Sequence, residues 1–297
     1  MTRIAGDHVS AAFLEILTTD DMKNLIIKGS TSLVLILAVC FSSCQKMERP
    51  EMDIIADDSV RMNAPLQMYL PFENSVLDSA QYQKGTESNV TYVNGVRGMA
   101  YKGASNAQLQ FPSALKMATM TSFTVSFWMN TEKHDGGAQC VFMLPNTEDF
   151  WGNMFMTIEG NNSATDNTML AKFNFAGNWV EFTGNNGLNR WPDMYGKWNH
   201  VVFTYDEVSS KFSTYINGSK LNLPANVTDR KNGSNPLGPL NFKNVSKFVI
   251  GGFQQHIGIR SPADSWMLHY TGMLDQFRVY TRALSDAEVG TLYTTKE

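Results

Sequence analysis

The sequence predicts an all-β fold in which two antiparallel sheets pack as a sandwich, with a short helical turn near the C-terminus. From Leu66 onward, short runs of alternating apolar and polar residues are separated by clusters of Gly and Asn, as is typical of strands and turns. No helical pattern lies between these runs, although a parallel sheet needs such crossover helices. The pattern therefore favours two packed antiparallel sheets.

Each predicted element has its own signal. Phe123–Trp128 alternates over six residues and predicts a half-buried strand. Asn217-Gly218 predicts a type I′ hairpin, because both of its positions need positive φ. Ser285 and Glu288 have the spacing of a capping box, which predicts the C-terminal helical turn. Further strands are predicted over residues 200–205, 212–216, 247–252 and 273–280.

Charge and composition exclude two classes of protein. The 297 residues include 24 Lys and Arg and 28 Asp and Glu, so no excess of positive charge is available to bind a nucleic-acid backbone. Charged residues make up 18% of the chain and aromatic residues 11%, which excludes disorder throughout. Three cysteines are too few for a disulfide framework.

The N-terminal part of the chain has the pattern of an export signal. Its longest apolar run, Leu33–Phe41, has nine residues, which suits a signal peptide but is too short to span a bilayer. Lys23 and Lys28 supply the preceding positive charge. Residues 1–21 are acidic where such signals are basic, so we expect translation to start at Met22. Residues 1–21 are then a wrongly assigned upstream extension, and residues 22–43 are the signal peptide.

The apolar run ends in Phe41-Ser42-Ser43-Cys44, which resembles the lipobox of Bacteroidetes-type bacterial lipoproteins. The resemblance implies cleavage before Cys44, lipidation of its sulfur, and anchoring in the bacterial outer membrane with exposure at the cell surface. Residues 44–65 are polar, acidic and without period, so we expect a flexible tether. The alternative is that Cys44 and Cys40 are small apolar residues in a buried helix.

The order of several segments resembles the laminin-G-like branch of the concanavalin A-like lectin/glucanase jelly rolls. The resemblance covers residues 66–297 and implies one jelly-roll domain. In the last strand, Gln276 stands where that family usually has an acidic residue. The segments that carry the resemblance are residues 69–73 with Asp78, 95–100, 122–128, 196–201, 215–218 and 272–293.

Sequence motifs disfavour catalysis. Hydrolases on this jelly roll carry Glu-x-Asp-x-x-Glu on one strand, which the predicted domain lacks. Glu148 and Asp149 are adjacent and would face opposite sides of a strand, while Glu181 stands alone. An enzyme with another carboxylate spacing stays a second hypothesis, which a second carboxylate about 5–10 Å from Glu148 or Glu181 would support.

Ligand binding has better candidates. Four tryptophans lie in turn-rich polar segments, and indole rings stack on the apolar faces of sugars. The alternative for each is that its ring fastens a loop to the core. Nearby amide, guanidinium and imidazole groups could read hydroxyl groups. The predicted ligand-binding residues are Trp151, Trp179, Trp191, Trp266, Asn178, Arg190, Gln254 and His256.

The same resemblance implies a calcium site, because these domains often hold Ca²⁺ on carboxylate and carbonyl oxygens. Asp78 and Asp275 are the candidate ligands, and Gln276 removes one charge from their neighbourhood. The alternative is that both aspartates cap turns.

We therefore expect a lipid-anchored, non-catalytic surface protein that captures or adheres to an extracellular glycan, beside neighbouring glycan-uptake proteins. Two alternatives stay open. One is a glycoside hydrolase or polysaccharide lyase on the same jelly roll, and the other is a structural or protein-binding adhesion module in which the tryptophans are packed. Exposure of the four tryptophans distinguishes the last of these from glycan binding.

Overall fold

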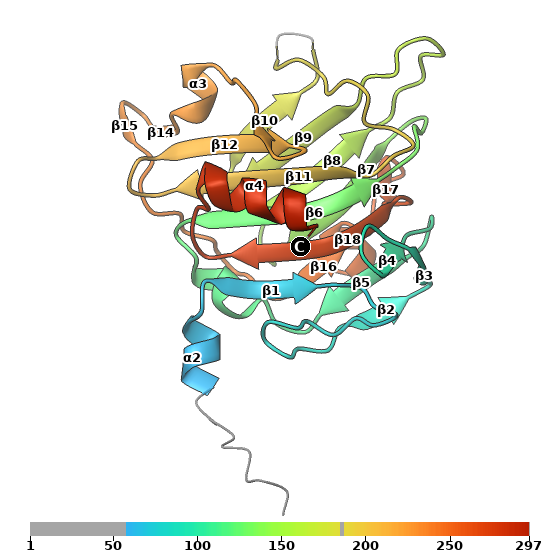
Figure 1. The fold of residues 1–297 in the computed structure, drawn as a ribbon, viewed down its shortest axis with the longest axis horizontal. Coiled ribbons are helices and arrows are strands. Elements are labelled where there is room, and N and C mark those ends of the chain that lie inside the picture. The colour runs from blue at the N-terminus through green and yellow to red at the C-terminus, as the bar shows by residue number, and fades with distance from the viewer. Residues whose placement is uncertain (1–57, 185–186, 297) are drawn as a thin grey trace, which may run out of the picture. The chain divides into compact units, whose positions relative to one another are not determined.

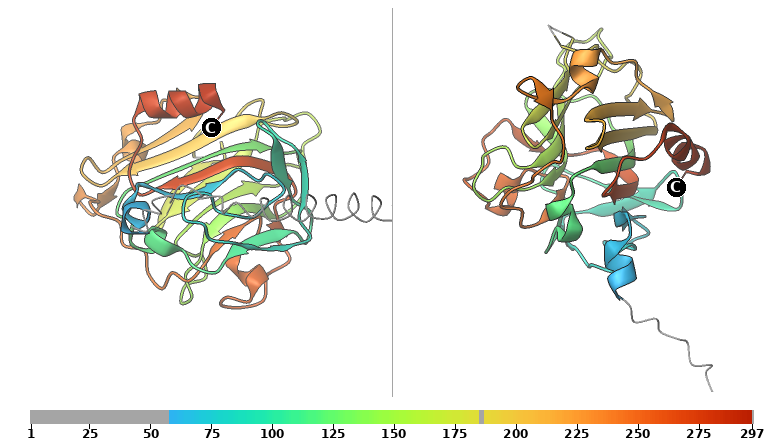
Figure 2. Two further views of the ribbon diagram at one scale, coloured as in Figure 1. Left: turned by 60° about the horizontal axis from the view of Figure 1, so that its bottom comes forward. Right: turned by 90° about the vertical axis from the view of Figure 1, so that its left-hand side faces the viewer.

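The alternating runs form two sheets that lie face to face (Figures 1 and 2). The computed structural model describes residues 58–184 and 187–296, which belong to one unit. All pairings between neighbouring strands in the two sheets are antiparallel, apart from the parallel pairing of β17 with β7. The predicted fold class is confirmed.

The first sheet has the order β13-β12-β11-β6-β18-β4-β3, and β1 also pairs with β18. Its strands are β1 (Leu66–Leu70), β3 (Thr91–Asn94), β4 (Met99–Lys102), β6 (Phe123–Asn130), β11 (Asn199–Asp206), β12 (Lys211–Ile216), β13 (Ser219–Lys220) and β18 (Met273–Tyr280).

The second sheet has the order β10-β9-β8-β7-β16-β5-β2, and β17 also pairs with β7. Its strands are β2 (Thr86–Ser88), β5 (Gln108–Phe111), β7 (Ala138–Leu144), β8 (Met154–Glu159), β9 (Leu170–Phe175), β10 (Asn178–Phe182), β16 (Phe248–Ile250) and β17 (Met267–His269). The remaining elements are the hairpin β14 (Lys231–Asn232) and β15 (Asn235–Pro236), the helices α2 (Asp58–Asn63), α3 (Ala225–Thr228) and α4 (Asp286–Thr295), and the 3₁₀ turns η1 (Leu115–Thr119) and η2 (Gln254–Ile257).

Aromatic side chains join the two sheets. Phe173 of β9 stacks on Phe203 of β11 with centroids 4.1 Å apart and planes at 3°. Phe127 of β6 meets Phe142 of β7 edge to face at 5.8 Å. One face of each sheet thus lies in a shared core, where offset and edge-to-face ring pairs are favourable.

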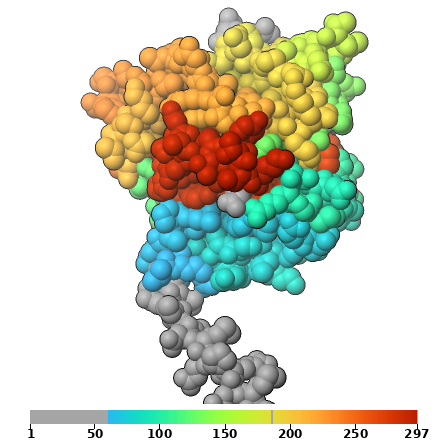
Figure 3. Space-filling view, viewed as in Figure 1, coloured from blue at the N-terminus to red at the C-terminus, as the bar shows by residue number. Residues whose placement is uncertain are grey.

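Helix α4 covers the outer face of the first sheet (Figures 1 and 3). Ser285 and Glu288 form the predicted capping box, and the helix extends beyond the single turn that we expected. Tyr293 of α4 stacks on Trp128 at 5.5 Å. The strand at Phe123–Trp128 is therefore buried on both faces, so the prediction of a half-buried strand is wrong. Alternation shows which residues face the core but not what covers the other face.

The predicted hairpin turn is confirmed. Asn217 and Gly218 have φ values of 52° and 76°, and Ile216 pairs with Ser219 across the turn. A two-residue turn with positive φ at both positions matches the right-handed twist of its two strands.

The described chain begins before the predicted domain boundary at Leu66. Helix α2 lies in the segment expected to be a tether, and Gln81 Nε2 donates a hydrogen bond to the carbonyl oxygen of Arg61, 3.0 Å away. The predicted extension, the signal peptide and Cys44 lie outside the described residues. In the part of the chain that the structure describes, no helix is both long and apolar enough to cross a membrane.

Candidate functional site

A second apolar cluster lies on the outer face of the second sheet. On β8, Met154, Met156 and Ile158 point into the shared core, whereas Phe155 between them points outward. Two loops partly cover this outer face, residues 145–153 and residues 251–266. The cluster contains Ala138, Cys140, Met143, Phe155, Val249, Phe253 and Met267, with Phe150, Trp179, Ile257, Ala263 and Trp266 packed against it.

Three tryptophans from distant parts of the sequence meet here. Trp151 comes from the 145–153 loop, Trp179 from β10 and Trp266 from the 251–266 loop. The ring centroid of Trp151 lies 5.2 Å from that of Trp179, with the planes at 88°, and 5.9 Å from that of Trp266. Trp151 is 40% exposed and the other two are half-buried. We call these three residues the tryptophan cluster.

Two cavities adjoin the tryptophan cluster, and both are lined by Trp151 and Trp179. The first, which we call the amide cavity, has a volume of about 340 Å³ and is also lined by Asn146, Asp149, Asn153, Asn174, Asn241 and Lys243. The second, the aromatic cavity, has a volume of about 260 Å³ and is also lined by Ala138, Phe155, Thr157, Glu159, Lys172 and Trp266. Apolar walls with a few polar groups are typical of ligand sites.

Asn174 is the most informative residue of the amide cavity. It lies on β9, in register with Phe155 on one side and Trp179 on the other, and is only 1% exposed. Neither its side-chain oxygen nor its nitrogen has a hydrogen-bond partner among the described residues. A buried amide without partners costs about 1–3 kcal/mol, which a ligand hydroxyl or a water can recover. We did not predict Asn174, because one polar residue on the outer face of a strand carries no distinguishing signal.

Gln254 is bound to the backbone of the 145–153 loop and does not face either cavity. Its side chain is fully buried, and its Oε1 accepts a hydrogen bond from the backbone amide of Asn146 at 2.9 Å. Its Nε2 donates to the carbonyl oxygen of Asp149 at 2.6 Å. Gln254 therefore holds the loop that carries Trp151, and the prediction that it contacts ligand is corrected to a positioning role.

His256 has a similar supporting role. Its ring lies parallel to that of His269 with centroids 3.8 Å apart. Nδ1 accepts from the Phe253 amide at 3.2 Å, so Nε2 carries the proton that is shared with the Met267 carbonyl oxygen. Burial, with His269 close by, lowers the pKa of His256 to about 4. A neutral His256 thus fastens the loop that carries Trp266, instead of reaching a ligand as predicted.

We expect acid to weaken the fold partly through His256. Its pKa of about 4 in the folded protein lies below the ordinary value of 6.5, so its contribution to stability is complete above pH 6.5 and decreases as the pH falls toward 4. Chemical unfolding of the wild type and His256→Gln at pH 7 and pH 4 measures this. The variant should lose less stability on acidification. Equal losses in the two proteins would contradict the assignment.

Three predicted residues do not reach the tryptophan cluster. Trp191 is 2% exposed and packs in the shared core, with its ring centroid 4.8 Å from that of Phe182, so it is a packing residue. Asn178 precedes Trp179 on β10 and therefore faces the other way, where its Oδ1 accepts from Arg230 Nη2 at 3.2 Å. Arg190 forms an ion pair with Asp166 at 2.5 Å.

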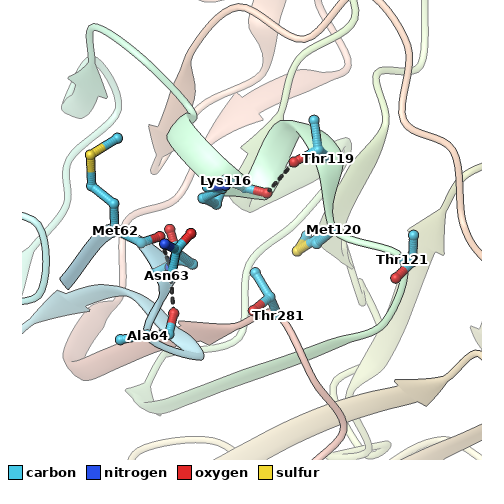
Figure 4. Close-up of a pocket in the computed structure, with 9 residues that line it drawn as sticks. Met62, Asn63, Ala64, Lys116, Thr119, Met120, Thr121 and Thr281 are labelled. Atoms are coloured by element: carbon cyan, nitrogen blue, oxygen red, sulfur yellow. Dashed lines mark hydrogen bonds between the residues drawn. The ribbon is translucent and has the colours of Figure 1, made fainter. Parts of the chain in front are cut away.

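Two further cavities lack these features. The first, about 360 Å³, is lined mainly by apolar side chains, among them Trp191 and Leu223. The second, about 270 Å³, lies between α2, η1 and the chain after β18, and Lys116, Thr119 and Thr281 are among the residues that line it (Figure 4). No aromatic residue is among the described residues that line this second cavity. Neither cavity combines an exposed indole with an unpartnered amide.

Asp78 and Asp275 are held by backbone amides. Asp78 Oδ1 accepts from the amides of Tyr69 and Ala80 at 2.8 and 2.9 Å. Asp275 Oδ2 accepts from those of Val96 and Arg97 at 2.8 and 3.0 Å. Burial raises the pKa of the Asp78 carboxyl group. It also raises the pKa of the Asp275 carboxyl group, to about 6.

This donor arrangement does not fit a calcium site. N–H donors occupy the positions around the carboxylates of Asp78 and Asp275 where a cation would lie, and Ca²⁺ needs six to eight oxygen ligands. Within residues 58–184 and 187–296, no group of three or more His, Cys, Asp or Glu side chains is placed to hold a metal ion. The geometry favours the alternative that both aspartates fasten loops.

A pair of carboxylates lies beside the aromatic cavity. Lys172 Nζ on β9 is 3.3 Å from Glu159 Oε1 on β8 and 3.7 Å from Glu181 Oε1 on β10. These two oxygens therefore lie no more than 7.0 Å apart, which is the sum of the two distances. The separation is compatible with that of glycosidase carboxylates, but the Lys172 ammonium lies beside both groups and neutralises charge between them.

Solved structures share this fold at low sequence identity. Domain 4 of AbnA, an extracellular arabinanase from Geobacillus stearothermophilus solved with arabinotriose, matches with a TM-score of 0.50 and 18% identity over 77% of this chain and 98% of that domain. The binding domain of Paraclostridial Mosquitocidal Protein 1 matches with a TM-score of 0.52 and 17% identity over 78% of this chain. The match covers 52% of the toxin domain, about half its length.

A sequence comparison identifies the family, although no curated protein matched the chain. The profile of Laminin_G_3, described as the concanavalin A-like lectin/glucanases superfamily, matches residues 102–290. This range is more than half of the chain and spans strands of both sheets. The chain belongs to the Laminin_G_3 family of the concanavalin A-like lectin/glucanases superfamily.

Proposed function

We propose that this protein binds an extracellular glycan at the tryptophan cluster and does not cleave it. The observation that carries the proposal is the unpartnered, buried amide of Asn174 beside the exposed ring of Trp151. A sugar offers both an apolar face to stack on indole and hydroxyl groups to pair with an amide. Exposure of Trp151 also favours binding over a purely structural role for this residue.

We also propose that the domain is held at the bacterial outer membrane by lipid on Cys44, with the glycan site outside the cell and glycan-uptake proteins as neighbours. The support is the order of Lys23, Lys28, the apolar run at Leu33–Phe41 and the lipobox-like residues before Cys44. Metabolic labelling with a fatty acid tests the anchor, since Cys44→Ser should lose the label. Protease shaving of intact cells tests surface exposure, and a domain left untouched would contradict it.

The test of glycan binding is a polysaccharide affinity-gel screen of the full chain, run with calcium and with chelator. Retardation by one glycan class that is lost in Asn174→Ala supports the proposal. Asn226→Ala, which removes an exposed amide on α3, is a control for the same substitution outside the tryptophan cluster. Loss of retardation with chelator supports the expected calcium, bound by residues other than Asp78 and Asp275. No retardation by host, plant or microbial glycans favours a protein-binding or structural module.

Glu159 and Glu181 favour a second candidate, a glycoside hydrolase. It predicts that the retained glycan is shortened on incubation and that Glu181→Gln abolishes product release while leaving retention intact. Retention without any reducing-end release supports binding alone.

A further inference from the structure

We infer that the site consists of two adjoining subsites, the amide cavity and the aromatic cavity, and that it takes a neutral linear glycan of at least two sugar units. This inference rests on the proposed function and specifies the ligand class. It goes beyond a single stacking site because it assigns separate contacts to consecutive sugars.

The two cavities share one wall. Trp151 and Trp179 line both, and the planes of these rings stand at 88° to each other. The faces of the two rings therefore point in different directions, and no single sugar can stack flat on both. A ligand that stacks on both rings therefore needs a separate sugar unit for each ring.

The two cavities differ in chemistry. The amide cavity contains the unpartnered Asn174 and is lined by further asparagines, so it is suited to reading hydroxyl groups. The aromatic cavity is walled by Trp151, Phe155, Trp179 and Trp266, and its polar groups include the ion-paired Glu159 and Lys172. It is suited to a sugar that stacks one face on rings and directs hydroxyls to the charged pair.

The charges of the lining favour a neutral ligand. Each cavity is lined by one lysine and one carboxylate, Lys243 with Asp149 and Lys172 with Glu159. Glu181 is a second carboxylate beside Lys172 and adds a further negative charge next to the aromatic cavity. The described residues of the site thus carry no excess of positive charge, and an anionic sugar such as a uronate meets at least one carboxylate for each ammonium group.

Calorimetric titration of the full chain tests the inference. The probes are mono-, di- and tetrasaccharides of the gluco-, xylo- and arabino- series, together with oligogalacturonates of matching length. We expect affinity to rise at least about tenfold from a monosaccharide to the longer chains of one neutral series, with weaker binding of the acidic series. Equal affinity for mono- and tetrasaccharide overturns the two subsites, and preferred binding of oligogalacturonate overturns the neutral class. Binding of no probe in any series contradicts the proposed function itself.

Variants of each cavity separate the subsites. Lys172→Met removes an ammonium from the aromatic cavity, and we expect it to lower tetrasaccharide affinity about two- to tenfold while leaving monosaccharide affinity unchanged. Asn174→Ala should lower both. Lys211→Met on β12 of the other sheet, which breaks an exposed ion pair with Asp229, is the matched control. Unfolding curves show whether each variant remains folded, and equal losses for mono- and tetrasaccharide in Lys172→Met contradict the assignment.

Discussion

Trp151→Ala is expected to abolish retardation on the glycan gel, with a loss in affinity of at least about 30-fold, or about 2 kcal/mol. Trp151 is the only residue that is both a member of the tryptophan cluster and strongly exposed, and it lines both cavities. Its removal takes away the stacking surface and joins the two cavities into a wider, shallower one. Affinity electrophoresis and calorimetry measure the loss.

The control for Trp151→Ala is an aromatic residue that is at least as exposed but lies elsewhere. Tyr82 is 65% exposed and lies near Arg61, with the guanidinium carbon 4.8 Å from its ring centroid. Tyr82→Ala should leave retardation unchanged, and Trp151→Phe should keep part of it because a smaller ring still stacks. Full binding by Trp151→Ala would place the glycan away from the tryptophan cluster.

Trp191→Ala is expected to lower the free energy of unfolding by about 3–5 kcal/mol, because it leaves a cavity in the core. The ring of Trp191 contacts those of Phe182 and Phe203, and only 2% of the residue is exposed. Chemical denaturation followed by circular dichroism measures the change. The fraction that stays folded should still bind the glycan.

Trp191→Phe tests the same assignment with a smaller change in volume. It keeps an aromatic ring in the core, so its stability should lie between those of the wild type and Trp191→Ala. A variant at Trp191 that stays fully stable but loses glycan affinity would show that this residue contacts ligand, as the sequence alone suggested.

The outline of the fold could be predicted from the sequence. Alternation at Phe123–Trp128 and at residues 273–280 predicted β6 and β18, and Ser285 with Glu288 predicted the start of α4. These signals are local, since strand alternation, turn φ angles and helix caps depend on residues that are neighbours in the chain. The sequence also indicated that tryptophans in polar segments were candidates for binding.

The division of those tryptophans between the candidate site and the core was decided only by the tertiary structure. Trp151, Trp179 and Trp191 all lie in turn-rich polar segments, so their local patterns are alike. The backbone amides of Trp191 and Met169 each donate a hydrogen bond to the other residue's carbonyl oxygen, which holds Trp191 against the core. Trp179 instead lies at an outward-facing position of β10. Burial depends on what other segments place around a ring, which no local pattern contains.

The partners of polar side chains were likewise set by contacts between distant segments. Gln254 and His256 have the residue types of a binding site, but the fold turns them onto the backbone of the loops that carry Trp151 and Trp266. Asn174 has no mark in the sequence, yet it lies unpartnered between Phe155 and Trp179 because three strands align in register. The sequence by itself determined the strands, the turns and the candidate rings. Which polar groups lack a partner among the described residues was decided by packing, because hydrogen bonds within the fold satisfy some buried amides and not others.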